Sequence, residues 1–336
     1  MPAVIKFGTS GWRAVMAEDF TFVSVRRAVT GIARYVASVK PQGAAVIVGR
    51  DPRFLGETFV TMAADILSAH GVTPRVIPDP APTPAISWAV IRTRSDGAIN
   101  FTASHNPPEY NGIKFSTPDG APALPEITSK IEAEIASLDG TASSETGARS
   151  PSSAVKREEL NVAPDYLARL NEIIDVAAIK QAGLHVCFDP LWGAARGYPD
   201  HLLRRAGVDV VTVHDYRDVL FGGHAPEPDD HLLSDLRAAM KKSGAHIGIS
   251  TDGDADRFGI LDQDGTFISP NYIIALLFDY LVETRGWRNG VAKSVATTNL
   301  VNALADHHNV SPPPGAPSPP GRARTSCPRR APRPTA

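Results

Sequence analysis

Two short polar segments of this chain carry the residue types that phosphate and metal chemistry require. The first reads Thr-Ala-Ser-His-Asn-Pro over residues 102–107, and Asn-Gly-Ile-Lys follows at residues 111–114. Asn-Pro and Asn-Gly favour tight turns, so we expect Ser104 on a rigid loop after a strand and Lys114 on the returning strand. A serine in a polar turn is usually structural. A Ser-His-Asp hydrolase is disfavoured because no Gly-x-Ser-x-Gly elbow surrounds Ser104.

The second segment reads Asp-Gly-Asp-Ala-Asp-Arg over residues 252–257 and directly follows an apolar stretch. Three carboxylates at alternate positions, Asp252, Asp254 and Asp256, can converge on one hard cation such as Mg²⁺. Without a cation they would repel one another. A solvated acidic turn is the alternative, but the preceding strand and Arg257, which suits an anionic ligand, favour a metal site. An EF-hand is excluded because the Gly and Glu that its loop requires are missing.

A third segment, Thr-Ser-Gly-Trp-Arg at residues 9–13, is weaker on its own. Small residues followed by Arg13 suit close approach to a phosphate, but a surface turn is the simpler interpretation. The Gly-Arg-Asp-Pro-Arg segment at residues 49–53 is similar, and we assign it a structural role. The sequence contains no Walker-type loop, dinucleotide fingerprint or zinc motif, so ATP-driven, nicotinamide and zinc chemistry lack support.

Apolar runs that alternate with amphipathic helical patterns must position these loops, which predicts an α/β protein. In the first half we expect strands at 44–49, 72–77 and 97–102 and helices at 57–70, 86–94 and 125–138. In the second half we expect strands at 184–189, 208–213 and 246–250 and helices at 164–180, 194–206 and 230–242. After these the pattern predicts helices at 271–284 and 299–307 with a strand near 291–297.

Composition divides the chain and limits its partners. The net charge of −2 gives no general attraction to nucleic acid or to an anionic membrane. No apolar run reaches the roughly 20 residues that span a bilayer. Of the 2 cysteines, Cys187 lies in an apolar run and should be buried, which fits a reducing cytoplasm. Residues 311–336 hold 9 of the 29 prolines and no acidic residue, and should be disordered.

Taken together and in this order, the segments at 9–13, 102–107 with 111–114, and 252–257 resemble the α-D-phosphohexomutase superfamily, in its phosphoglucomutase/phosphomannomutase branch. The segments at 49–53, 81–85, 188–195 and 226–228 add to the similarity, which extends from residue 4 to about residue 308. The resemblance implies tandem three-layer α/β/α domains, with the third incomplete and the fourth absent.

The expected domain boundaries follow from the resemblance and from the breaks in composition. They are domain I with the phosphoserine loop at 1–140, a linker at 141–160, domain II with the metal-binding loop at 161–262, a partial domain III at 263–310, and the tail at 311–336. The tail has the composition of an out-of-frame translation of a GC-rich gene, and we take this as a hypothesis for its origin.

The resemblance also implies the roles of the residues. Ser104 would be the phosphorylated serine, and one Mg²⁺ would be held by Asp252, Asp254 and Asp256 together with a phosphoryl oxygen on Ser104. Lys114 would be a general acid or base. His105, Arg13 and Arg257 would line the site and stabilise the transferring phosphate, with Thr9 and Ser10 beside them.

The activity that the resemblance implies is interconversion of hexose 1-phosphate and hexose 6-phosphate, of glucose or mannose, with a hexose 1,6-bisphosphate as intermediate and activator. The partner is thus a phosphorylated hexose, and the oligomeric state is open. We expect the missing domains to weaken the reaction, since remote binding energy supports the chemical step. Two alternatives remain: a non-catalytic remnant that still binds metal, and a phosphatase with an aspartate nucleophile.

Overall fold

The computed structural model describes residues 4–8, 10–138 and 157–310 of the 336-residue chain. Most of the expected linker and the whole of the expected tail, residues 311–336, lie outside the described residues. The chain divides into one compact unit that ends at Ile268 and a second that begins at Ser269. Among the described residues, no helix combines the length and apolar character needed to cross a membrane.

The first unit contains two sheets, of which the first has six strands in the order β1-β5-β4-β2-β3-β6. The strands are β1 (Trp12–Val15), β2 (Ala45–Arg50), β3 (Thr73–Val76), β4 (Ala98–Phe101), β5 (Tyr110–Ser116) and β6 (Glu158–Glu159). β2 runs parallel to β3 and β4, whereas β5 runs antiparallel to β4 and β1. All six residues of β2 are buried, as expected for a central strand covered on both faces.

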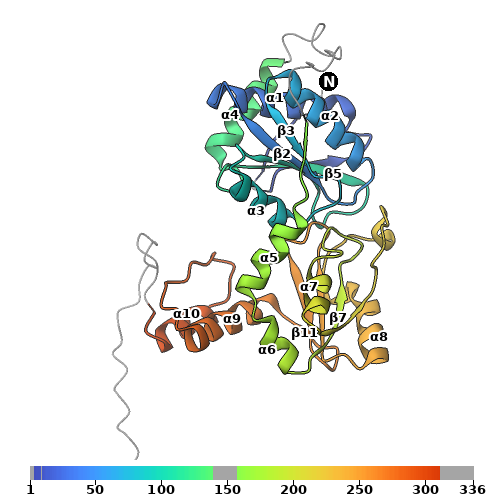
Figure 1. The fold of residues 1–336 in the computed structure, drawn as a ribbon, viewed down its shortest axis with the longest axis vertical. Helices are drawn as coiled ribbons and strands as arrows, with labels where there is room; N and C mark the ends of the chain where they lie inside the picture. The colour runs from blue at the N-terminus through green and yellow to red at the C-terminus, as the bar shows by residue number, and fades with distance from the viewer. Residues whose placement is uncertain (1–3, 9, 139–156, 311–336) are drawn as a thin grey trace, which may run out of the picture. The chain divides into compact units, whose positions relative to one another are not determined.

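Helices cover both faces of this sheet. One core joins the sheet to α1 (Phe22–Val39), α2 (Gly56–Ala69) and α4 (Pro125–Ser137). A second core joins it to α3 (Thr83–Thr93) and α5 (Ala163–Ile173), and α3 lies across the sheet from α1 in Figure 1. α1 begins at a capping box in which Thr21 accepts the backbone N–H of Ser24. The layers are those of an α/β/α sandwich.

The second sheet has five strands in the order β11-β10-β9-β7-β8. They are β7 (His185–Asp189), β8 (Asp209–Thr212), β9 (Ile247–Thr251), β10 (Phe258–Leu261) and β11 (Phe267–Ile268). β7 is parallel to β8 and β9, and β9, β10 and β11 form an antiparallel meander. α8 (Ser234–Ser243) packs on this sheet, and Cys187 is fully buried beneath it, as the sequence predicts.

Three helices differ from expectation. The one expected at 164–180 is split into α5 and α6 (Val176–Gln181), because Asp175 accepts the N–H of Ala178 and starts a new helix. The one expected at 194–206 is reduced to α7 (Pro199–Arg205). Ala194 instead donates its N–H to Gly253, so its backbone is committed to the neighbouring loop. The one expected at 230–242 is a 3₁₀ turn (Asp230–Leu232) followed by α8.

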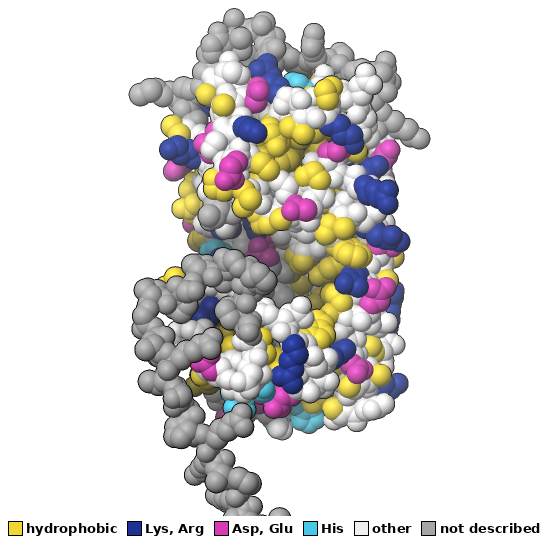
Figure 2. Space-filling model, turned by 90° about the vertical axis from the view of Figure 1, so that its left-hand side faces the viewer, with side chains coloured by type: hydrophobic (Ala, Val, Ile, Leu, Met, Phe, Trp, Pro, Cys, Tyr) yellow, Lys and Arg dark blue, Asp and Glu magenta, His cyan; other side chains and the backbone are white. Residues whose placement is uncertain are grey.

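The described part of the second unit consists of α9 (Pro270–Arg285), α10 (Leu300–His307) and an irregular connection. The strand expected near 291–297 is wrong. The described residues of this unit contain no other strand with which it could pair, and a lone strand leaves its backbone groups unsatisfied. On the face in Figure 2, basic and acidic side chains are intermixed, in keeping with the small net charge.

Candidate active site

The two loops singled out from the sequence meet in the structure. The Ser104 hydroxyl donates a hydrogen bond of 2.7 Å to Asp252 Oδ2, and both side chains are buried. Ser104 lies just beyond the end of β4 and Asp252 just beyond the end of β9, at the strand ends where α/β proteins place their ligands. A Cβ at Gly253 would lie 2.6 Å from the Ser104 carbonyl oxygen, so only glycine permits this approach.

The Ser104 backbone is held in an uncommon conformation. Its φ of 52° lies in the left-handed region, which non-glycine residues rarely adopt. The Ser104 N–H donates to Thr102 Oγ1 at 2.8 Å, and the Thr102 hydroxyl donates to Asp51 Oδ2 at 2.7 Å. Asp51, in the segment 49–53 that the sequence left as structural, therefore supports the serine loop.

The aspartate loop is the hairpin connection between β9 and β10, curled by one of its own carboxylates. Asp252 Oδ1 accepts the backbone N–H groups of Asp256 and Arg257, each at 3.0 Å. This turn brings the three carboxylates together, and one oxygen from each lies within 4.8 Å of the others.

The donor set fits a magnesium ion. Asp252 and Asp254 have no exposed surface, and Asp254 Oδ1 has no hydrogen-bond partner among the described residues. A buried carboxylate oxygen with no donor is costly unless a cation compensates it. Oxygen ligands grouped in this way suit Mg²⁺.

Lys114 is the charged side chain that faces these carboxylates. Its Nζ donates to Asp254 Oδ2 at 2.6 Å and to Asp256 Oδ2 at 2.7 Å. Burial lowers the Lys114 pKa most as a single effect, but the two aspartates together raise this pKa above its ordinary value. Lys114 is therefore held protonated, and its charge offsets part of the negative charge of the carboxylates.

The aspartates differ in their protonation. Burial foremost, and then the charges of Asp254 and Asp256, raise the pKa of Asp252 to about 7. Burial alone would also raise the pKa of Asp254, but the contacts of Lys114 with Asp254 lower it. The cluster thus keeps the charge of Asp254 and resists that of Asp252, as expected where one cation serves several carboxylates.

Two residues that support Asp254 escaped the sequence analysis. Thr83, at the start of α3, donates its hydroxyl to Asp254 Oδ2 at 2.5 Å and its N–H to the Asp254 carbonyl at 2.8 Å. Asn100 of β4 donates to Thr83 Oγ1 at 2.9 Å. Thr83 belongs to the Ala-Pro-Thr-Pro-Ala segment that contributed to the resemblance, but nothing local in the sequence links it to a loop 171 residues away.

Arg13 and His105 lie beside Ser104. Arg13 Nη1 donates to Asn106 Oδ1 at 2.7 Å, and the buried Arg13 Nε has no partner among the described residues. His105 Nδ1 lies 3.4 Å from Ser104 Oγ. Burial, and then the charge of Arg257, lower the His105 pKa, so its imidazole is neutral near pH 7. The neutral imidazole thus lies against the serine hydroxyl, and Arg13 keeps a spare donor on the same loop through its contact with Asn106.

The side chains of the remaining predicted residues make no hydrogen bond to Ser104 or to the three aspartates among the described residues. Arg257 is exposed and lies 3.4 Å from Glu227, at the rim of the site. Ser10 is exposed, and among the described residues no hydrogen bond joins it to Ser104 or to the aspartates. Thr9 lies outside the described residues.

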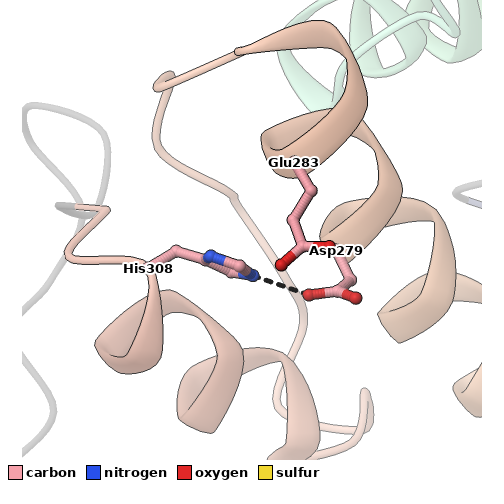
Figure 3. Close-up of side chains that lie close together, drawn as sticks. All are labelled: Asp279, Glu283 and His308. Carbon is pink, nitrogen blue, oxygen red and sulfur yellow. Dashed lines mark hydrogen bonds and ion pairs between the residues drawn. The ribbon is translucent and has the colours of Figure 1, made fainter. Parts of the chain in front are cut away.

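A second group of possible metal ligands lies in the second unit. One ligand atom from each of Asp279, Glu283 and His308 falls within 4.8 Å of the others. Figure 3 shows the His308 ring directed at the two carboxylates from the end of α10, and His308 Nε2 bonds to Asp279 Oδ1 at 2.6 Å. The hydrogen bond gives His308 and Asp279 a structural role that needs no metal.

Comparisons with known proteins match both halves of the first unit to domains of one family. Residues 4–141 match the domain described as phosphoglucomutase/phosphomannomutase, alpha/beta/alpha domain I. Residues 164–265 match alpha/beta/alpha domain II of the same family. The Ser104 loop therefore lies in the first matched domain and the aspartate loop in the second.

Individual relatives extend the similarity. A phosphoglucomutase/phosphomannomutase of Thermococcus kodakarensis is 32% identical over 301 residues, which cover 89% of this chain and 64% of the relative. A protein of Methanopyrus kandleri assigned as a phosphoglucosamine mutase is 31% identical and covers 83% of this chain and 59% of the relative. The chain thus spans about 60% of the length of these relatives.

A solved structure agrees in fold and in sequence. The crystal structure of a Thermus thermophilus protein assigned as a phosphomannomutase superposes with a TM-score of 0.80 at 31% identity, and covers 91% of this chain and 68% of that one. The matched domains, the relatives and this structure all show that the chain belongs to the phosphoglucomutase/phosphomannomutase family.

Proposed function

We propose that this chain carries the phosphoserine and metal-binding part of a mutase that interconverts hexose 1-phosphates and hexose 6-phosphates. The observation that carries the proposal is the 2.7 Å hydrogen bond from Ser104 to Asp252, next to an Asp254 oxygen that lacks a donor. A nucleophilic hydroxyl against a cation site is the arrangement that phosphoryl transfer requires.

In the proposed reaction, phosphorylated Ser104 gives its phosphoryl group to the free hydroxyl of a hexose monophosphate. The bond from phosphorus to Ser104 Oγ breaks, a bond from phosphorus to the sugar oxygen forms, and the hydroxyl proton passes to a basic group. The product is a hexose 1,6-bisphosphate. After the bisphosphate reorients, Ser104 Oγ loses its proton and bonds to the other phosphorus. The bond from that phosphorus to the sugar oxygen breaks, this oxygen takes up a proton, and no phosphate is consumed overall.

The residues of the site suit these steps. When bound, one Mg²⁺ would be held by Asp252, Asp254 and Asp256 and would offset the charge of the transferring phosphoryl group. Lys114, whose Nζ lies against Asp254 and Asp256, is placed to give a proton to an oxygen at the site. His105, whose lowered pKa leaves it neutral, is suited to accept a proton, and Arg13 offers its spare Nε–H to a phosphate.

The substrate class is a phosphorylated hexose, and the choice of sugar remains open. The two relatives carry names that refer to different sugars, so overall similarity does not separate glucose, mannose and glucosamine phosphates. We assign domain I to 1–140, domain II to 161–262 and the start of a domain III to 263–310. The buried free thiol of Cys187 supports a reducing compartment such as the cytoplasm.

The test follows formation of glucose 6-phosphate from glucose 1-phosphate, with Mg²⁺ and a trace of glucose 1,6-bisphosphate, in the full chain and in Ser104→Ala. In parallel, mass spectrometry follows transfer of one phosphoryl group from the bisphosphate to Ser104. We expect Ser104 to be phosphorylated and any isomerisation to disappear in the variant.

Each other outcome points to a different function. Phosphorylation without isomerisation would mean that this chain performs only the transfer step. Release of inorganic phosphate that survives Ser104→Ala but not Asp252→Asn would replace the mutase with an aspartate-nucleophile phosphatase. Neither phosphorylation nor isomerisation, with Mg²⁺ still bound, would identify a non-catalytic remnant.

A further inference from the structure

Arg53 is the largest fully buried side chain in the described part of the protein, and all of its donors are used. Its Nη2 donates to the carbonyl oxygens of Ser104 at 2.8 Å and Asn106 at 2.6 Å. Its Nη1 donates to those of Pro107 at 2.8 Å and Tyr110 at 2.9 Å. A guanidinium has five N–H donors in one plane, and four of them here bind a single loop.

The fifth donor connects Arg53 to a second support of the same loop. Arg53 Nε donates to Asp51 Oδ2 at 3.1 Å, the oxygen that also accepts the Thr102 hydroxyl. Thr102 in turn accepts the Ser104 N–H. Ser104 is thus held at its carbonyl by Arg53 and at its amide through Asp51 and Thr102, which accounts for its left-handed backbone.

Arg53 also touches the half of the unit that carries the aspartates. Its guanidinium lies over the ring of Phe221, 5.0 Å from the centroid, and Phe221 is fully buried. The neighbouring Gly222 lies against Trp192, because a Cβ there would be 2.3 Å from the indole. Two residues beyond Trp192, Ala194 donates its N–H to the Gly253 carbonyl of the aspartate loop at 2.9 Å.

We propose that Arg53 is a positioning residue which, with Asp51, sets the conformation of the Ser104 loop and aims the serine hydroxyl at the metal-binding aspartates. The expected effect of Arg53 on phosphorylation of Ser104 rests on the proposed function, whereas its expected effect on the conformation of the loop does not. Lysine cannot replace it, because an ammonium has three donors around a point charge and cannot reach four carbonyls spread along a loop.

Arg50 provides a matched control. It is an arginine of the same segment, also buried, at 5% exposure against 0% for Arg53. It pairs with Glu57 at 2.9 Å and donates to the carbonyl oxygens of Asp51 at 3.3 Å and Pro78 at 3.2 Å, and none of its hydrogen bonds among the described residues reaches residues 102–110. Arg50→Met and Arg53→Met thus both remove a buried arginine, but only Arg53→Met also removes hydrogen bonds to the Ser104 loop.

The first measurement is hydrogen exchange of the full chain without substrate. The amides of Ser104, Asn106 and Tyr110 are bonded within the loop and report on it. We expect Arg53→Met and Arg53→Lys to exchange at least about tenfold faster over 102–110, with α1 unchanged, and Arg50→Met to leave this segment as in the wild type. Asp51→Asn should fall between them.

The second measurement is phosphorylation of Ser104 by a hexose 1,6-bisphosphate. We expect both Arg53 variants to react about 100-fold more slowly, because a small misplacement of a reacting group costs about that much, and Arg50→Met to react within a few-fold of the wild type. If Arg53→Met fails to fold, Arg53→Lys and Asp51→Asn carry the same comparison.

The outcomes separate the two proposals. Equal effects of Arg50→Met and Arg53→Met on exchange over 102–110, or full function of Arg53→Lys, would overturn the positioning role. A wild-type chain that is never phosphorylated at Ser104 would contradict the proposed function, while the exchange comparison would still decide the role of Arg53.

Discussion

Two groups of three possible metal ligands occur among the described residues. The distances within the two groups are similar, but their burial and their hydrogen-bond partners differ. Asp252, Asp254 and Asp256 come from one hairpin loop in the first unit. In the second unit Asp279 and Glu283 come from α9, and His308 follows the end of α10. Both sets bring one atom of each residue within 4.8 Å of the others. Distance alone therefore does not distinguish them.

The burial of the side chains and their hydrogen-bond partners distinguish the two groups. Asp254 is fully buried and keeps one oxygen without a donor, which costs about 1–3 kcal/mol unless something binds there. In the second group the Asp279 carboxylate is 36% exposed and already bonded to His308. A buried carboxylate oxygen without a donor indicates a ligand, whereas a partly exposed carboxylate that already accepts from a histidine does not.

The largest expected effect is that of Asp254→Asn. This variant should lose Mg²⁺ binding and at least about 1000-fold of any phosphoryl transfer, because the charge that faces the cation is removed. A rise in melting temperature on addition of Mg²⁺, present in the wild type and absent in the variant, is the direct measurement. Asp279→Asn is the control and should keep the full rise, and its loss there would reverse our assignment of the two groups.

The next effect is that of Gly253→Ala, which tests the close approach of the two loops. A Cβ 2.6 Å from the Ser104 carbonyl should push the loops apart and slow phosphorylation of Ser104 about 100-fold. Gly286→Ala, at the end of α9, is the counterpart in the second unit. Its φ is +65° and nothing lies within 4 Å of the new Cβ, so it should cost about 1 kcal/mol of stability and no activity.

A smaller effect is expected from His308→Gln. The His308 side chain is 9% exposed, and its hydrogen bond with Asp279 should contribute about 1 kcal/mol to the stability of the second unit. Chemical denaturation of the full chain, followed by hydrogen exchange over α9 and α10, measures this loss. A change in Mg²⁺ affinity would contradict a purely structural role for His308 and Asp279.

The smallest effect concerns His214, an imidazole that lies between carboxylates in the first unit. Its Nδ1 lies 3.0 Å from both Asp189 oxygens and its Nε2 lies 3.2 Å from Asp235, while its ring stacks on Trp192. Burial lowers the His214 pKa, but the two aspartates outweigh it and raise the pKa above its ordinary value.

A raised pKa in the folded state contributes stability below the unfolded value of about 6.5, and this contribution is lost as the pH rises through the folded value. Melting temperatures measured from about pH 6 upward should therefore decline more for the wild type than for His214→Gln. Parallel profiles for the two proteins would show that His214 does not gain a proton on folding.

Much of the fold follows from local pattern. The strands near 44–49, 97–102 and 184–189 are continuous apolar runs, and they form β2, β4 and β7 at the expected places. The errors arose where tertiary contacts take the backbone away from its local preference. Ala194 bonds to Gly253 instead of continuing a helix, and Asp175 caps a new helix inside an apparently continuous one.

The residues of the candidate site likewise fall into those that local sequence pattern reveals and those that only tertiary contacts reveal. Ser104, Lys114 and the three aspartates stand in compact segments whose residue types suggest their chemistry, so they can be found in the sequence alone. Arg53, Thr83 and Asn100 cannot, because each acts through hydrogen bonds to partners that are distant along the chain, as in the 171-residue separation of Thr83 from Asp254.

The sequence by itself determined the α/β class and the family resemblance and singled out the candidate chemical groups, because these depend on residue type and short-range spacing. Only the tertiary structure decided that Ser104 touches Asp252, that Asp254 keeps an unpaired oxygen, and that Arg53 binds the serine loop with four of its five donors. Those facts depend on how two sheets bring their strand ends together, and packing across the core sets that arrangement.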